Sequence, residues 1–228
     1  MPEQFDQYST SYETELAKSL AASGESRDYF ALGRVAWLAK CLHKLDVKPQ
    51  RVLDFGCGDG MTTPLLLKSL GATAAIGADV SEGSIRVARE KYATEGVSYD
   101  VLSSFRAAGD IDVAYCNGVF HHIVPDERDH AVATVRDALE PGGLFSLWEN
   151  NPWNPATRYV MSRCAFDDDA ITLSPPTARR LLKKNGFEIV RTDYAFIFPR
   201  ALRALRFIEN LVYWAPAGTQ YQVLARKI

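Results

Sequence analysis

The stretch from Val52 to Gly60 constrains the fold of this chain more than any other part of the sequence. Arg51 to Phe55 has the pattern of a short buried strand, and Gly56, Gly58 and Gly60 follow at two-residue spacing. A helical pattern of leucines then begins. Strand, glycine turn and helix together predict the first crossover of a doubly wound α/β sheet, which binds ligands outside the carboxyl ends of its strands. The glycines let the backbone approach a ligand without a Cβ in the way.

The residues in and after the turn indicate the kind of ligand. A dinucleotide-binding turn reads G-x-G-x-x-G, whereas this turn reads G-x-G-x-G, with Met61 at the position of the third glycine. Asp54 precedes the turn and Asp59 lies inside it, and two carboxylates would repel a pyrophosphate but attract an ammonium group. Asp79 ends the next predicted strand, a position from which an acid binds ribose hydroxyls. The alternative is that the glycines serve only chain geometry.

The stretch that begins at Asp54 resembles the first motif, E/D-x-G-x-G-x-G, of class I S-adenosylmethionine-dependent methyltransferases. This resemblance implies a doubly wound, mostly parallel sheet of seven strands in the order 3-2-1-4-5-7-6. The last strand is antiparallel, helices cover both faces, and N-terminal helices form a lid. It also implies that S-adenosylmethionine is the cofactor and S-adenosylhomocysteine the product.

The same resemblance implies which residues bind the cofactor. They follow the first four predicted strands: Asp54, Gly56, Cys57 and Gly58; Asp79 and Val80; Ser103, Ser104 and Phe105; Asn117 and Gly118. In related methyltransferases an acid often follows the third strand and contacts the adenine amino group. Ser103 and Ser104 hold that place here, so a serine hydroxyl, a backbone carbonyl or the Phe105 ring would supply the contact.

Three further segments resemble a bacterial subfamily of small-molecule methyltransferases from polysaccharide, glycolipid and secondary-metabolite pathways. They are E-N-x-P-x-N-P at 149–155, C-x-F-D-x-D-A at 164–170 and Q-Y-x-V-x-A-R at 220–226. The acceptor is therefore expected to be a small molecule, such as a sugar, a lipid-linked compound or a polyketide-like compound. Its expected contacts are Tyr8, Tyr12, Glu149, Asn150 and Trp153, with Trp153 as an apolar wall.

The whole chain, residues 1–228, is expected to form one domain. Residues 1–48 would form the N-terminal helical lid and residues 49–228 the Rossmann-like core, with a helical insertion near 199–216. Aromatic and apolar residues recur at helical spacing from Phe5 to Leu20. This pattern fits a lid over the cofactor as well as a helix that caps the core.

Methyl transfer from a sulfonium is an in-line displacement, so the protein mainly aligns the donor with the acceptor and excludes water. An acceptor oxygen or nitrogen that carries a proton also needs a base. His121 and His122 follow the fourth predicted strand and are the candidate catalytic residues, since histidine titrates near physiological pH. One of the two is expected to face the cavity. The alternative is that both histidines are structural.

Composition excludes several other classes of function. The net charge of −2 does not favour nucleic acid, and the loop at Asn151 follows the wrong strand for a nucleic-acid N-P-P-Y motif. The four cysteines are widely separated, and the N-terminus lacks the pattern of a signal peptide. We therefore expect a cytoplasmic location. Asp167 to Asp169 could ligate a metal through hard oxygens, but helix capping is the favoured interpretation, and no metal is expected.

Residues 200–214 combine arginines at every third position with apolar residues at helical spacing. Such a helix could lie on a membrane surface. The favoured interpretation is a helix that lines the acceptor entrance, with at most weak membrane contact. Two other functions compete with methyl transfer: a non-catalytic protein that binds S-adenosylmethionine, and a nicotinamide-dependent oxidoreductase.

Overall fold

The computed structural model describes residues 24–164, 167 and 169–228. Its sheet has seven strands in the order β3-β2-β1-β4-β5-β7-β6, as predicted. The strands are β1 (Arg51–Phe55), β2 (Ala74–Asp79), β3 (Val97–Val101), β4 (Ile111–Asn117), β5 (Leu139–Asn150), β6 (Phe187–Ala195) and β7 (Gln220–Lys227). Strand β7 pairs antiparallel with both β5 and β6, whereas the other pairs are parallel. The predicted fold class is confirmed.

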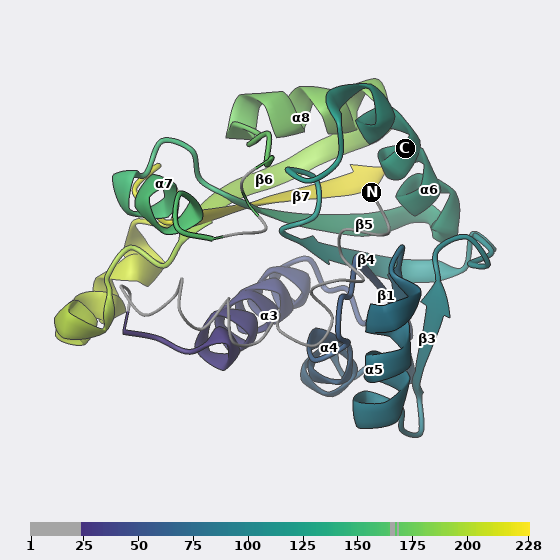
Figure 1. Cartoon of the computed structure of the whole chain (residues 1–228). Coiled ribbons are helices and arrows are strands. Elements are labelled where there is room, and N and C mark those ends of the chain that lie inside the picture. Colours follow the sequence, from purple (N-terminus) through teal and green to yellow (C-terminus); the bar gives the residue numbers. More distant parts are fainter. Residues whose placement is uncertain (1–23, 165–166, 168) are drawn as a thin grey trace.

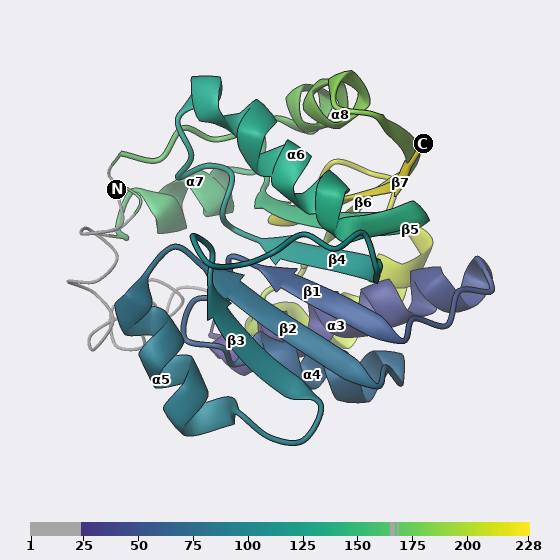
Figure 2. The ribbon, with the colours of Figure 1, turned by 90° about the vertical axis from the view of Figure 1, so that its right-hand side faces the viewer.

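Helices cover both faces of this sheet (Figures 1 and 2). The α-helices are α3 (Arg27–Lys44), α4 (Thr62–Leu70), α5 (Glu82–Tyr92), α6 (Arg128–Ala138), α7 (Pro155–Met161) and α8 (Pro175–Lys184). Two 3₁₀ segments, η2 (Pro125–Glu127) and η4 (Arg200–Leu211), complete the described elements. Helices α3 and α4 lie on one face of the sheet, and α6 and α8 lie on the other.

The alternation of side chains along the central strands explains the two faces. Val52 of β1 packs against Leu38 of α3 and Leu66 of α4. Its neighbour Leu53 points the other way and belongs to the cluster that holds Val132 of α6. Because each central strand is buried on both faces, nearly continuous apolar runs such as β1 are required.

Local sequence signals set the starts of several helices. The side-chain oxygens of Ser26, Ser81 and Ser174 accept a backbone hydrogen bond at the N-termini of α3, α5 and α8. Asn154 does the same for α7, where Pro155 occupies the first turn.

The largest departure from prediction lies at η4. The 3₁₀ turn η2 leads directly into α6, and strand β5 begins at Leu139, directly after α6. The predicted helix after Arg200 is a 3₁₀ segment with non-helical dihedral angles at Leu202. Tyr8 and Tyr12 lie outside the described residues, so the predicted contacts of these two side chains stay predictions.

Candidate active site

A cavity of about 1250 Å³ opens at the carboxyl ends of the central strands. Residues that end or follow β1, β2, β4 and β5 line it, among them Gly56, Asp79, Asn117 and Asn150. This is the edge at which a doubly wound sheet binds its ligands. The structure thus gathers most of the predicted site residues around one cavity.

The three glycines of the turn all have positive φ, but their surroundings differ. A Cβ at Gly56 would lie 2.2 Å from Cγ2 of Val119, and one at Gly60 would lie 2.6 Å from Cβ of Ala88. These two glycines are required by packing against protein atoms. A Cβ at Gly58 would meet nothing within 4 Å, and Gly58 lines the cavity. Gly58 is therefore the position where a side chain would occupy ligand space.

Asp54 is almost completely buried below the turn and accepts a hydrogen bond of 2.8 Å from the hydroxyl of Thr63. Burial raises the pKa of this carboxyl to about 7, although the Thr63 bond opposes the rise. The neighbouring thiol of Cys57 also lines the cavity, and burial raises its pKa well above the usual value. Asp54 is thus poised to gain charge when a cation approaches it.

Asp59 differs from its expected role as a second attractor of an ammonium group. Both of its carboxylate oxygens accept hydrogen bonds from the guanidinium of Arg27, at the start of α3. The positive charge of Arg27 offsets the negative charge of Asp59. Of the two carboxylates that were predicted to attract an ammonium group, only Asp54 therefore remains available. The Arg27 contact also ties α3 to the glycine turn.

Asp79 ends β2 and holds the turn in place. Its two carboxylate oxygens accept hydrogen bonds of 2.9 Å from the backbone N–H groups of Gly58 and Ser81. Asp79 and its neighbour Val80 both line the cavity. Each carboxylate oxygen has two lone pairs, so these backbone bonds are compatible with a ligand hydroxyl at the same carboxylate.

The three residues expected to contact adenine have different surroundings in the structure. Ser103 lines the cavity, together with Leu102, which the sequence analysis missed. Ser104 donates to the carbonyl of Val101 at 2.9 Å and faces solvent. Phe105 packs against the hydrophobic core. Of the three residues, Ser103 is the one that lines the cavity, and the adenine contact itself stays a prediction.

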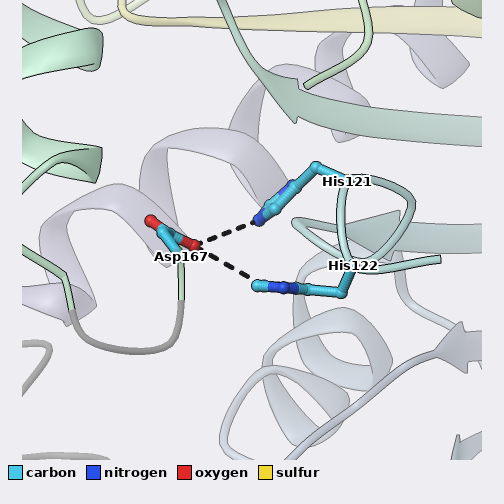
Figure 3. Close-up of side chains that lie close together, drawn as sticks. All are labelled: His121, His122 and Asp167. Carbon is cyan, nitrogen blue, oxygen red and sulfur yellow. Dashed lines mark ion pairs between the residues drawn. The ribbon is translucent and has the colours of Figure 1, made fainter. Parts of the chain in front are cut away.

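The cavity is lined by the last residue of β4, Asn117, and by three residues that follow this strand: Gly118, His121 and His122. One histidine was expected to face the cavity, whereas both histidines line it. Figure 3 shows both rings directed toward the carboxylate of Asp167. The Nε2 atoms of His121 and His122 lie 3.5 Å and 3.6 Å from Oδ1 of this residue.

His121 lies between two carboxylates. Its Nδ1 atom is 2.6 Å from Oε2 of Glu149, and its side chain is only 4 % exposed. Burial alone would lower the pKa of His121, but Glu149 and Asp167 outweigh burial and raise it to about 10. Burial, followed by the adjacent charge of His121, lowers the pKa of His122 to about 4. At neutral pH His121 therefore keeps its proton, and His122 is the neutral member of the pair.

The loop after β5 differs from the predicted acceptor wall. Glu149 is 1 % exposed, and its Oε1 atom accepts a hydrogen bond from the backbone of Phe120, so it lies behind His121. Trp153 is half exposed. Asn150, which was also predicted to contact the acceptor, lines the cavity, and so does Asn154. Glu149 is buried because it lies on the central strand β5.

Helix α3 contributes lining residues that were not among the predicted site residues. Tyr29, Phe30 and Arg34 line the cavity. Arg34 is buried and donates hydrogen bonds of 2.9 Å to the hydroxyl of Tyr115 and to the side chain of Gln220. An arginine on the same helical face as Phe30 and Leu38 was the available signal, because a charged residue within an apolar stripe is seldom buried without a role.

The segment at 196–211 departs from the predicted entrance helix. Phe196, Phe198 and Pro199 line the cavity, so the lining comes from residues before η4. Arg206 is turned inward, where it donates to Glu25 at 2.8 Å and lies over the Tyr29 ring. Phe207 is 70 % exposed. The charge of Arg206 is therefore compensated within the protein.

Residues 52–143 match the protein family described as methyltransferase domain. A trans-aconitate 2-methyltransferase of Rhodopseudomonas palustris (strain BisB5) is 31 % identical over 120 residues, which cover 53 % of this chain and 46 % of that protein. A trans-aconitate 2-methyltransferase of Rhizobium leguminosarum bv. trifolii is 29 % identical over 192 residues, which cover 77 % of this chain and 74 % of that protein. The chain spans about half the length of the Rhodopseudomonas relatives that it matches.

The fold is also similar to solved structures. A crystal structure of an S-adenosylmethionine-dependent methyltransferase from Thermotoga maritima superposes with a TM-score of 0.68 at 16 % identity, and the match covers 100 % of both chains. At this identity the likeness concerns the fold. Among the described residues, the helices are too short or too polar to span a bilayer.

Proposed function

We propose that this chain, whose residues 52–143 match the methyltransferase domain family, transfers the methyl group of S-adenosylmethionine to an oxygen or nitrogen atom of a small molecule. The observation that carries this proposal is Gly58, a turn glycine with open space beside it, between Asp54 and Asp79 in the cavity. A backbone that approaches a ligand this closely, next to an acid that becomes charged near a cation, suits the methionine part of the cofactor.

In the proposed complex, Asp54 stabilises the ammonium group and Asp79 accepts hydrogen bonds from the ribose hydroxyls. Ser103 and Leu102 lie beside the adenine. Asn117 and Gly118 would then flank the methyl group, because they follow β4 next to the glycine turn. Arrangement of donor and acceptor within such a cavity supplies most of the catalysis, since the sulfonium is already a good electrophile.

The histidine pair supports a refinement of the acceptor. His121 cannot take up a proton while it keeps its own, and His122, with a pKa of about 4, is a weak base. Both properties favour an acceptor atom that is already unprotonated at neutral pH, such as a carboxylate oxygen. The names of the trans-aconitate relatives, which refer to a carboxylic acid, support the same class.

Cofactor binding by two glycine variants tests the proposal. Wild-type protein is expected to bind S-adenosylhomocysteine with a Kd in the micromolar range in a calorimetric titration, about −8 kcal/mol. Gly58→Val should lose this binding, because its branched side chain would fill ligand space. Gly71→Val is the matched control, since Gly71 also has positive φ and open surroundings but ends α4 away from the cavity. Equal affinity of both variants would refute the proposed position of the ligand.

Turnover tests the role of the histidines separately from binding. Because a carboxylate oxygen has no proton to lose, we expect His122→Ala to lower kcat on a carboxylic-acid acceptor much less than loss of a full general base would, while the Kd of the cofactor stays within about twofold. Loss of a general base typically costs about 10²- to 10⁴-fold in rate, so a smaller loss is expected for a weak base. Formation of S-adenosylhomocysteine is the measurement, over a panel of small carboxylic acids that includes trans-aconitate. His43→Ala, on the exposed end of α3, is the control.

Unchanged kcat in His122→Ala would assign this residue a structural role. Two other functions make different predictions. A non-catalytic binding protein would bind the cofactor and give no product with any acceptor. A nicotinamide-dependent oxidoreductase would bind NAD rather than S-adenosylhomocysteine.

A further inference from the structure

We propose that His121, His122 and Asp167 form a binding site for one divalent transition-metal ion of the Zn²⁺ type. One imidazole nitrogen of each histidine and a carboxylate oxygen of Asp167 all lie within 4.8 Å of one another. Figure 3 shows the three side chains converging on a common point. The prediction that no metal binds rested on the run of acids from Asp167 to Asp169 alone.

The distances within the cluster suit a metal better than direct hydrogen bonds. The two imidazole nitrogens lie 3.5 Å and 3.6 Å from the carboxylate oxygen, beyond the usual range for N–H···O bonds of about 2.7–3.2 Å. Two ligands at about 2.0–2.1 Å from a tetrahedral ion lie about 3.4 Å apart. An ion could therefore bridge either imidazole and the carboxylate with shifts of a few tenths of an ångström, and the ligand atoms of the two histidines, which lie within 4.8 Å of each other, would close around it.

The surroundings of His121 are those of a metal-ligating histidine. Its Nδ1 atom lies 2.6 Å from Oε2 of Glu149, and Glu149 is itself held by the backbone N–H of Phe120 at 2.8 Å. A carboxylate at Nδ1 orients the ring and presents Nε2 as the ligand atom, as in carboxylate–histidine–zinc triads. The backbone carbonyl of His121 also accepts a hydrogen bond from Ile171, which ties the segment beyond Asp167 to the histidine pair.

Charge and ligand type identify the class of ion. Glu149 and Asp167 bring two carboxylates to one buried place, and a divalent cation would balance both after it displaces the proton that His121 holds without metal. Two imidazoles and one carboxylate favour Zn²⁺, Fe²⁺ or Co²⁺ over Mg²⁺ or Ca²⁺, which prefer oxygen ligands. Three protein ligands leave at least one coordination position for another molecule, as in catalytic zinc sites.

All three ligands line the cavity that holds the proposed active site. An ion there would bind an oxygen atom of the acceptor and fix its position relative to the methyl donor. This catalytic consequence rests on the proposed methyl transfer. The binding of the ion does not, because it requires neither cofactor nor acceptor.

Metal binding to the full chain, without cofactor, is the test. The protein is stripped with a chelator, loaded with Zn²⁺ and analysed by mass spectrometry for bound metal, and Co²⁺ is titrated while its visible absorption is followed. Wild-type protein should bind one ion per chain. His122→Ala and Asp167→Asn should lose stoichiometric binding, and Glu149→Gln should weaken it by about 10- to 100-fold. His43→Ala, which removes an exposed histidine, should bind as the wild type does.

The proposal is overturned if wild-type protein binds no Zn²⁺ or Co²⁺, or if His122→Ala and Asp167→Asn bind as well as His43→Ala does. The latter result would mean that the ion is adventitious only and that the cluster is an ion-pair network. Thermal unfolding and S-adenosylhomocysteine titration of each variant show that it is folded. They also separate failure of the metal site from failure of the proposed function, because cofactor binding is expected in all of them.

Discussion

The turn repeats a glycine at equal spacing, at Gly56, Gly58 and Gly60, yet the surroundings of the three glycines differ. Gly56 leaves room for Val119, and Gly60 leaves room for Ala88 and the Tyr99 ring. Only Gly58, of these three, borders open space. The motif therefore predicts the turn from sequence, but it does not predict which glycine meets the ligand, because that depends on side chains from other elements.

Asp79 is expected to contribute more to cofactor affinity than a typical acid at the end of a strand. Asp79→Ala should weaken binding of S-adenosylhomocysteine at least about tenfold, since each hydrogen bond to a charged acceptor contributes about 1.5–3 kcal/mol. The change also removes the acceptor of the Gly58 N–H, which loosens the turn. Calorimetry measures the effect, with Asp100→Ala on the adjacent strand β3 as the control. Unchanged affinity in Asp79→Ala would contradict the ribose assignment.

The raised pKa of Asp54 predicts how affinity depends on pH. The cofactor's ammonium group favours the charged form of Asp54, so below about pH 7 binding must displace a proton. Affinity should therefore rise by up to about tenfold per pH unit between pH 6 and 7 and level off near pH 8. Calorimetric titrations across this range give the slope. Asp54→Asn should remove the pH dependence, and a slope equal to that of the wild type would refute the assignment.

The same group affects stability without ligand in the opposite direction. The folded state binds the proton of Asp54 with a pKa of about 7, compared with a model value of 3.8. Between these two values the folded state holds more protons than the unfolded state. The contribution of Asp54 to stability is therefore complete below the lower value and is lost as the pH rises toward 7.

At the scale of elements, η4 shows how a sequence pattern can predict an amphipathic segment but assign its faces wrongly. The spacing of apolar residues in 200–214 suggested that they pack inward. In the structure Phe207, Leu211 and Trp214 are about 70 % exposed, whereas Arg206 contacts Glu25 and Tyr29. Glu25 and Tyr29 are far from Arg206 in sequence, so no local pattern could predict that they attract it.

This arrangement changes the expected membrane behaviour of η4. We expect weak, reversible co-sedimentation with liposomes that contain anionic lipid, driven by apolar side chains and therefore little changed by salt. Replacing both Phe207 and Trp214 with serine should abolish it, whereas Leu32→Ser, on an exposed position of α3, should not. Binding that disappears at high salt would instead indicate that arginines dominate, at about 1 kcal/mol each. Absence of binding by the wild type would also contradict the prediction.

At the scale of the whole molecule, ligand binding should stabilise the folded chain. Because the proposed ligand contacts residues after β1, β2, β3 and β4, its binding free energy contributes to the stability of the sheet as a unit. At one hundred times Kd, S-adenosylhomocysteine should add about 2.7 kcal/mol. This corresponds to a rise in Tm of roughly 5–10 °C for a chain of this size.

Thermal unfolding with and without ligand measures the rise. NAD at the same concentration is the control ligand, and Gly58→Val is the control variant. A shift with NAD but none with S-adenosylhomocysteine would favour the oxidoreductase over the methyltransferase. A rise of equal size in Gly58→Val would place the ligand elsewhere in the molecule.

The sequence alone determined the glycine turn, the first strand and, through family resemblance, the order of the sheet. These features depend on neighbours in sequence and on burial of apolar residues, which periodicity records. Only the tertiary structure decided which charges are paired. Arg27 and Asp59 are 32 residues apart, and His121 and Glu149 are 28 apart. Whether a carboxylate attracts a ligand or is already compensated depends on what folding brings within a few ångströms of it, because electrostatic interactions at buried sites are strong only at short range.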